Sequence, residues 1–253
     1  MAMDRLPILQ PVMTGYRDTL NAASAMWPLA VIAIVIVLMS TIFDIVVPLR
    51  QIDGSFFGSL LSFILNAVQS FFLVPVMIAV HRFIILDEVT PRYVLDPGGR
   101  IFRAFFGWLL ALSALSLLVT VVLTPINLPL IVSATLIIAG IITVLVVMVR
   151  LTILFPAIAV DAPGATAANA WADSKGHGFG IFLIFLLAVL PLMLVVVAVV
   201  FTLGFGERVG LGLGFVSIVI IGIAQAFFIM LCVAIASRLF QALAGRLVAD
   251  PGK

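Results

Sequence analysis

The stretch LIVSATLIIAGIITVLVVMVR, from Leu130 to Arg150, decides the class of this protein. About twenty uncharged residues precede the arginine, and at about 1.5 Å of rise per residue a helix of that length crosses roughly 30 Å of hydrocarbon. Arg150 therefore falls where a headgroup layer begins. The segment predicts a helix that crosses a membrane.

Five other stretches have the same length and apolar character. Because the connections between them are short, no separate soluble domain is expected. The fold class that we predict is all-α: a polytopic membrane protein with six transmembrane helices and short interfacial helices on the cytoplasmic side. It forms a single membrane domain over residues 1–253. The predicted transmembrane helices cover residues 26–49, 57–80, 104–123, 130–149, 179–203 and 210–237.

Composition supports the same class. Hydrophobic residues make up 64% of the chain and charged residues 9%, whereas ordinary soluble domains carry about 25% charged residues. The net charge of +2 is small and the basic residues are scattered, which excludes nucleic acid as an expected partner. The single cysteine, Cys232, lies in the last apolar stretch and excludes an intramolecular disulfide.

The distribution of basic residues predicts the orientation. When successive connections are placed on alternate sides, eleven of the 13 Lys and Arg residues fall on one side, and Arg50 and Arg208 fall on the other. The positive-inside rule then places both termini in the cytoplasm. The first apolar run has no small-residue cleavage site, so no cleaved signal peptide is expected.

The cytoplasmic connections are predicted to lie against the membrane surface. In the N-terminal segment, Val12, Tyr16 and Leu20 recur every four residues and predict an interfacial helix, with an irregular tail as the alternative. Basic side chains at helix ends can reach lipid phosphates. The candidate headgroup contacts are Arg82, Arg100, Arg103, Arg150 and Lys175. Anchoring without a dedicated lipid site is the alternative for these residues.

A second short helix is predicted after Asp161. The alanine-rich run that follows places Ala167, Ala170, Trp171 and Ser174 on one face, and Gly176 is predicted to stop the helix as a C-terminal cap. A small-residue face with one Trp suits a helix pressed flat against the bundle, with the indole ring at the interface.

Polar residues within the apolar stretches are candidates for function because they are costly in hydrocarbon. Asn66 and Gln69 are three residues apart on one helix face, and Gln225 lies near the middle of the last helix. We predict a buried polar cluster of these three residues, which serves as a packing clamp or lines a transport path. Asp44 lies near the outer end of the first helix and is expected to pair with Arg50 at the interface, with a proton or cation site as the alternative.

The sequence predicts no catalysis. It lacks the His-Glu-x-x-His zinc motif and the serine, histidine or paired aspartate patterns of intramembrane proteases. His81 and His177 have no cysteine or carboxylate cluster near them in sequence. We therefore expect neither a metal ion nor a cofactor.

Several motifs at the cytoplasmic ends of the helices carry a resemblance to a known family. They are HRFIILDE (His81–Glu88), FPAIAVD (Phe155–Asp161) after Arg150, ANAWADSKGHGF (Ala168–Phe179) and SRLFQALAG (Ser237–Gly245). These motifs resemble a bacterial membrane-domain family, mostly of unknown function, related to the segment that precedes some glycerophosphodiester phosphodiesterases. The motif residues that carry the resemblance are His81, Pro156, Asp161, Trp171 and Gly176.

The resemblance implies a six-helix bacterial inner-membrane protein and little about activity. The leading hypothesis is a non-enzymatic membrane-embedded scaffold or lipid-organising module. Its expected partners are anionic headgroups on the cytoplasmic side, and a membrane protein partner or a second copy of the chain. The alternative is a small transporter or permease that uses Asn66, Gln69 and Gln225, with Asp44 as a further candidate.

Overall fold

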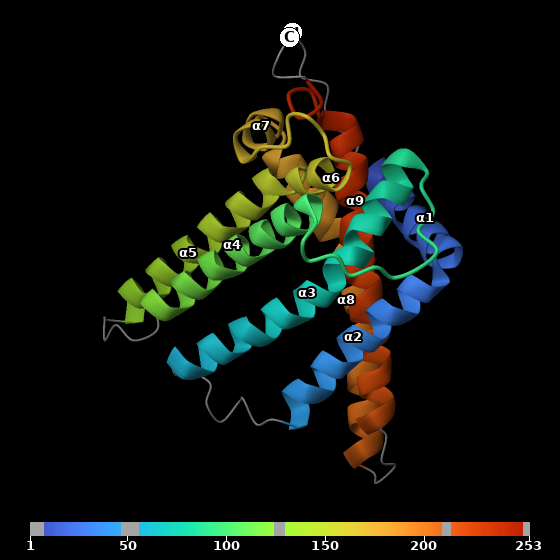
Figure 1. Ribbon diagram of the computed structural model, residues 1–253. Helices are drawn as coiled ribbons and strands as arrows, with labels where there is room; N and C mark the ends of the chain where they lie inside the picture. Colours follow the sequence, from blue (N-terminus) through green and yellow to red (C-terminus); the bar gives the residue numbers. More distant parts are fainter. Residues whose placement is uncertain (1–7, 47–55, 124–129, 209–213, 250–253) are drawn as a thin grey trace.

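The computed structural model describes residues 8–46, 56–123, 130–208 and 214–249, and this part of the chain is helical without strands. The long helices are α2 (Trp27–Val46), α3 (Phe56–Leu86), α4 (Arg100–Leu123), α5 (Leu130–Leu151), α8 (Gly178–Arg208) and α9 (Gly214–Leu243) (Figure 1). The short ones are α1 (Leu9–Ala25), α6 (Leu154–Ala159) and α7 (Ala167–Asp173). The predicted all-α polytopic fold is confirmed.

Five helices, α3, α4, α5, α8 and α9, are long and apolar enough to cross a membrane. The helix α2 forms a bent pair with α1, at an angle of 103°, and this pair is a sixth candidate crossing when it is counted as one span. Four helices extend by four or more residues beyond their predicted ends: α3 continues to Leu86, α4 begins at Arg100, α8 continues to Arg208 and α9 continues to Leu243. The extensions of α3, α4 and α9 bind other segments at one end of the bundle, which explains why these three helices continue past the apolar core.

The predicted N-terminal helix is present as α1, and the face that it packs against the bundle includes Val12 but not Leu20. Leu20 is 60% exposed. The buried positions are instead Val12, Gly15, Asp18, Thr19 and Ala22. Their spacing of three and four residues forms one helical face, which packs against α8 and α9. Gly15 permits this approach, because a Cβ atom there would lie 2.6 Å from Cγ1 of Ile235.

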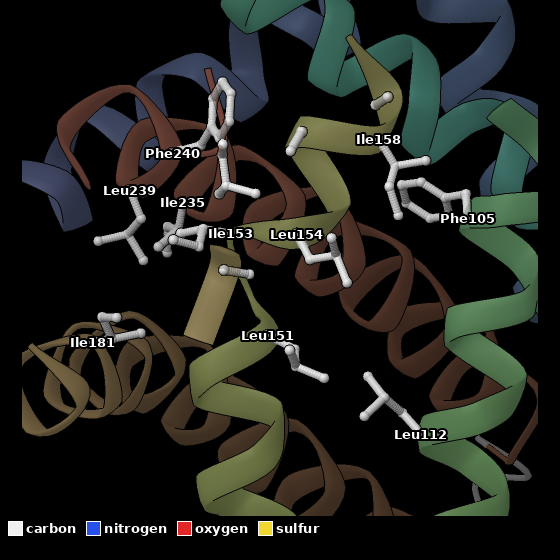
Figure 2. Close-up of a cluster of buried hydrophobic side chains, with 14 of the residues drawn as sticks. Phe105, Leu112, Leu151, Ile153, Leu154, Ile158, Ile181, Ile235, Leu239 and Phe240 are labelled. Atoms are coloured by element: carbon white, nitrogen blue, oxygen red, sulfur yellow. The ribbon is translucent and has the colours of Figure 1, made fainter. Parts of the chain in front are cut away.

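The apolar run after Arg150 breaks rather than continuing as one helix. Pro156 has no N–H for the carbonyl of Thr152 and would disrupt a continuous helix at that point. It is tolerated in the first turn of α6, where N–H groups need no helical partner. The break inserts α6 into the bundle, and Figure 2 shows Ile153, Leu154 and Ile158 among side chains of α4, α8 and α9.

The predicted short helix after Asp161 is present as α7, and it ends within one turn of the predicted cap at Gly176. The Oγ1 atom of Thr166 accepts a hydrogen bond of 3.2 Å from the backbone N–H of Asn169 and so caps the N-terminus. Ala170 and Ser174 are fully buried, whereas Trp171 is 44% exposed. The helix ends at Asp173, and Gly176, with φ of 87°, lies in the turn that follows.

The central helix of the bundle is α9, which packs against α1, α2, α3, α6 and α8. One buried cluster joins α4, α6, α8 and α9 (Figure 2), and a second joins α2, α3 and α9. The helices lie close together at the end that carries α6 and α7. Toward the opposite end, α4 and α5 diverge from α8 and α9 (Figure 1). We call the convergent end, with α6, α7, connection 87–99 and turn 244–249, the polar end.

Two of the described helices, α3 and α8, contain a proline beyond the first turn, and in each a tyrosine binds the carbonyl three residues before the proline. A proline leaves the carbonyl four residues earlier without a donor and loosens the helix around it. Tyr93 Oη donates to the carbonyl of Phe72, 2.9 Å away and three residues before Pro75. Tyr16 Oη donates to the carbonyl of Ala188, 2.7 Å away and three residues before Pro191. These are the two tyrosines of the chain.

Candidate functional site: an apolar cavity beneath the polar end

Arginine side chains connect the helix ends at the polar end. Nε of Arg82 donates to Oε2 of Glu88 at 2.7 Å, and a second guanidinium nitrogen donates to the carbonyl oxygen of Ala159 at 3.1 Å. Arg100 pairs with both carboxylate oxygens of Asp161. The end of α3 and the start of α4 are thereby joined to the end of α6.

Asp161 takes up an unusual backbone conformation at the end of α6. Its φ is 55°, in the left-handed region that glycine favours. Its N–H donates to the carbonyl of Ile158 at 3.0 Å, and the N–H of Ala162 donates to that of Ala157 at 2.9 Å. These bonds form a Schellman motif with an aspartate where glycine is usual. The aspartate provides the carboxylate that Arg100 binds.

A second set of contacts holds the turn 244–249 against α7. The carboxylate of Asp173 accepts hydrogen bonds from three consecutive N–H groups, those of Gly245, Arg246 and Leu247, with distances between 2.8 and 3.1 Å. Gly164 N–H donates to the carbonyl of Leu247 at 3.1 Å. The three-donor arrangement satisfies backbone groups beyond the end of α9.

The structure divides the five predicted headgroup contacts into two groups. Arg82, Arg100 and Arg150 bind protein groups; Nη1 of Arg150 donates to the carbonyl of Ser174 at 2.5 Å, and its guanidinium lies 5.6 Å from the centre of the Trp171 ring. Arg103 and Lys175 are exposed. The predicted motif residues Asp161 and Trp171 are thus brought beside predicted headgroup arginines.

Three of the cavities in the described part of the chain have distinct linings. The first, of about 470 Å³, lies under the connection 87–99 and is lined by residues that include Arg82, Arg92, Asp96, Arg100 and Asp161. Tyr93 also lines it, and burial raises the pKa of this phenol. Because charges of both signs face this cavity, it has no strong preference for either an anion or a cation.

The second cavity, of about 550 Å³, is the largest of these three; it is apolar and lies where α4 and α5 part from α8 and α9. Five of its lining residues are phenylalanines, and none of its lining residues is charged. A volume in the range of about 300 to 1,000 Å³ is typical of sites for small molecules. The phenylalanines are Phe105, Phe155, Phe182, Phe185 and Phe228.

His81 is the most polar side chain that faces the apolar cavity. It is 1% exposed, and its ring centre lies 5.9 Å from that of Phe105. Its Nδ1 atom lies 2.7 Å from Oγ of the fully buried Ser237 on α9. Thr152 and Cys232 line the same cavity. A large apolar cavity with few polar groups is the usual form of a binding site, so we take it as the candidate site.

The prediction that Asn66, Gln69 and Gln225 form a buried cluster is wrong. Asn66 and Gln225 are exposed, and Nδ2 of Asn66 donates to the carbonyl of Ser62 on its own helix at 2.8 Å. The prediction fails because α3 diverges from α9 over its first half (Figure 1). The Asp44 side chain and Arg50 lie outside the described residues, so their predicted pair stays a prediction.

Asn66 instead lines a third cavity, of about 410 Å³, between α3 and α4. Serine hydroxyl groups from both helices face this cavity. The serines are Ser59, Ser62, Ser70, Ser113 and Ser116. With Asn66 included, the polar residues of α3 recur at spacings of three and four residues, which was a signal in the sequence for a polar helix face.

Sequence reasoning missed Asp173, Asp18 and Ser237. The partners of these residues lie 72 to 220 positions away along the chain, as with Asp18 and Arg238, and no local pattern marks such pairs. His81 was noted as a motif residue, without its partner.

Comparison of the chain with protein-family models, with curated proteins and with solved structures finds no match.

Proposed function

We propose that the protein is a non-enzymatic lipid-organising module of a membrane, in which an acyl chain occupies the apolar cavity. The observation that carries the proposal is this cavity of about 550 Å³ at the point where α4 and α5 diverge from α8 and α9. Its lining is apolar and uncharged, as an acyl chain requires. An empty apolar space of this size forfeits dispersion contacts, whereas acyl chains surround such helices in a membrane.

We further propose that the polar end faces the cytoplasm of a bacterium, at the inner membrane, with both termini on that side. The count of basic residues supports this orientation. Arg103 and Lys175 are exposed at this end and suit contact with anionic headgroups. Arg82, Arg100 and Arg150 have the same proposed role beside their protein contacts.

The contacts at the polar end fit a scaffold better than a moving transporter. Ion pairs and hydrogen bonds join α3 to α6, α4 to α6, α1 to α9, and α7 to the turn 244–249. Such cross-links hold the convergent end fixed while the opposite ends of the helices spread apart. A lipid chain between the diverging helices would fill the apolar cavity, which lies where the helices begin to separate.

A matched pair of substitutions on α8 tests the proposal. Val189 lines the cavity, whereas Val195 is 56% exposed on the outer surface. Val189→Phe fills the cavity, and Val195→Phe adds the same volume outside it. After mild detergent extraction, native mass spectrometry should find a lipid retained by the wild-type protein and by Val195→Phe, and less lipid on Val189→Phe. Equal retention by all three proteins would refute the cavity as the site.

The polar cavity between α3 and α4 favours a second candidate, a small transporter for neutral polar solutes. Serine hydroxyls and Asn66 face it within two membrane-spanning helices, where polar groups are costly. Flux of glycerol or urea into proteoliposomes, abolished by Asn66→Leu with Ser113→Ala, would support transport. Absence of flux in the wild-type protein would exclude these solutes.

A further inference from the structure

His81 gives the apolar cavity one polar contact with a defined direction. The imidazole is almost fully buried, and it lines the cavity from α3. Since Nδ1 contacts Ser237, the ring can offer only Nε2 to a molecule in the cavity.

The hydrogen bonds of Ser237 assign the proton of the imidazole. A serine hydroxyl has one proton, and Oγ of Ser237 donates it to the carbonyl of Val233 at 3.0 Å. With the hydroxyl proton on this bond, Oγ accepts a hydrogen bond from Nδ1–H of His81. A neutral imidazole protonated at Nδ1 has a lone pair at Nε2. The cavity thus presents a hydrogen-bond acceptor, and a complementary ligand has to bring a donor.

The lining also limits the charge of the ligand. No charged side chain lines this cavity. A phosphate or carboxylate placed there would lose its hydration without an ionic partner, which costs several kcal/mol. An uncharged donor, such as an alcohol hydroxyl group, loses far less because Nε2 replaces one of its hydrogen bonds with water.

We infer that the cavity binds an uncharged lipid that carries a free hydroxyl group, of the diacylglycerol class, with this hydroxyl donating to Nε2 of His81. The inference rests on the proposed lipid binding in the same cavity. It adds the direction of the hydrogen bond and the chemical class of the lipid. Thr152 and Cys232 lie on the same lining, and Oγ1 of Thr152 donates to the carbonyl of Met148 at 2.8 Å.

The test compares two probes that differ by one proton donor. A diacylglycerol and its methyl ether, in which the hydroxyl is capped, are offered separately to the full-length protein in phosphatidylcholine nanodiscs. Bound lipid is measured by native mass spectrometry. The wild-type protein should retain the free alcohol roughly tenfold better than the ether, as one lost hydrogen bond implies. This comparison needs no variant and so does not depend on the folding of one.

Two substitutions then assign the preference to Nε2. Asparagine places its amide near the position of Nδ1 and lacks a group at Nε2, whereas the longer glutamine places an acceptor near Nε2. His81→Asn should bind both probes alike, His81→Gln should keep part of the preference, and the control Cys232→Ala should keep all of it. Circular dichroism establishes that each variant is folded.

The outcomes separate the inference from the proposed function. Equal binding of the two probes by the wild-type protein, with retention still lowered by Val189→Phe, would refute the hydroxyl contact and leave the lipid site in place. A preference that persists in folded His81→Asn would also refute the assignment to His81. Binding of neither probe, together with no effect of Val189→Phe on any lipid, would refute both.

Discussion

The buried carboxylate of Asp18 accepts a hydrogen bond of 2.5 Å from Nε of Arg238 and joins the N-terminal helix α1 to the central helix α9. The Asp18 side chain is 7% exposed and that of Arg238 is 33% exposed. Arg238 also donates to Gln241, whose amide donates to the carbonyl of Ile84 near the end of α3. The guanidinium of Arg238 therefore joins α9 to α1 directly and to α3 through Gln241.

Because Asp18 is more buried than Arg238, replacing the arginine should lower the free energy of unfolding more than replacing the aspartate. Arg238→Met leaves the Asp18 carboxylate buried without its partner, and we expect a loss of roughly 3 kcal/mol of unfolding free energy. Asp18→Asn keeps a polar acceptor, and the partly exposed arginine stays hydrated, so we expect about 1 kcal/mol. Denaturant unfolding in micelles, followed by circular dichroism, measures both. Equal costs would contradict the assigned burial.

Gly164 is predicted to be intolerant of any side chain. A Cβ atom there would lie 2.2 Å from the carbonyl oxygen of Arg246 and 2.9 Å from that of Leu247, and both are backbone atoms that cannot rotate away. Gly164→Ala should release the turn 244–249 and make its amides exchange faster. The matched control is Gly107→Ala in α4, where no atom lies within 4 Å, and it should be neutral or stabilise by up to about 1 kcal/mol. Unchanged exchange in Gly164→Ala would count against this packing.

Because the phenol of Tyr93 is partly buried, we expect the free energy of unfolding to fall at high pH. Burial raises the pKa of its phenol above the ordinary value of 10.0. The unfolded chain therefore releases this proton first, and the contribution of Tyr93, full below pH 10, is lost as the pH rises through the folded pKa. Tyr93→Phe should cost about 1 kcal/mol at neutral pH and reduce the decline above pH 10. An identical decline in the variant would assign it to other groups.

At Asp161 two effects are expected to offset each other. Asp161→Gly relieves a left-handed conformation that costs about 1 kcal/mol for a residue with a Cβ atom. It also removes an exposed ion pair with Arg100, worth at most about 1 kcal/mol. The net change in unfolding free energy should therefore be close to zero, whereas Asp161→Ala should be destabilising because it keeps the strain and loses the pair. Denaturant unfolding of the two variants decides between this account and a dominant role for the ion pair.

The membrane-spanning helices were predictable from the sequence because apolar length is a local property. Leu130–Arg150 could be placed for that reason, and the short helix after Asp161 could be placed from its alanine-rich composition. The helix boundaries were missed mainly where helix ends pack at the polar end. In α1 the spacing of Val12, Tyr16 and Leu20 suggested one face, and packing against α9 selected another, with Gly15 at its centre.

The site was less predictable because it depends on how helices diverge. Asn66 and Gln225 lie on helices that contact each other, but α3 and α9 separate at the depth of Asn66, which no periodicity reveals. The apolar cavity is formed by residues that look like ordinary core positions, such as Phe105 and Phe182. Of the lining residues, the sequence singled out His81 and Cys232, and the bond of His81 to Ser237 spans 156 positions along the chain.

Occupation of the apolar cavity by an acyl chain is tested most directly by photocrosslinking in the native membrane. Cells that express the protein would incorporate a diazirine fatty acid into their lipids, and lipid adducts would be mapped to residues by mass spectrometry after irradiation. Adducts are expected on cavity residues such as Phe182, Phe185 and Phe228, and they should decrease in Val189→Phe. Adducts confined to outward-facing residues such as Val195, at the same level in Val189→Phe, would contradict the account.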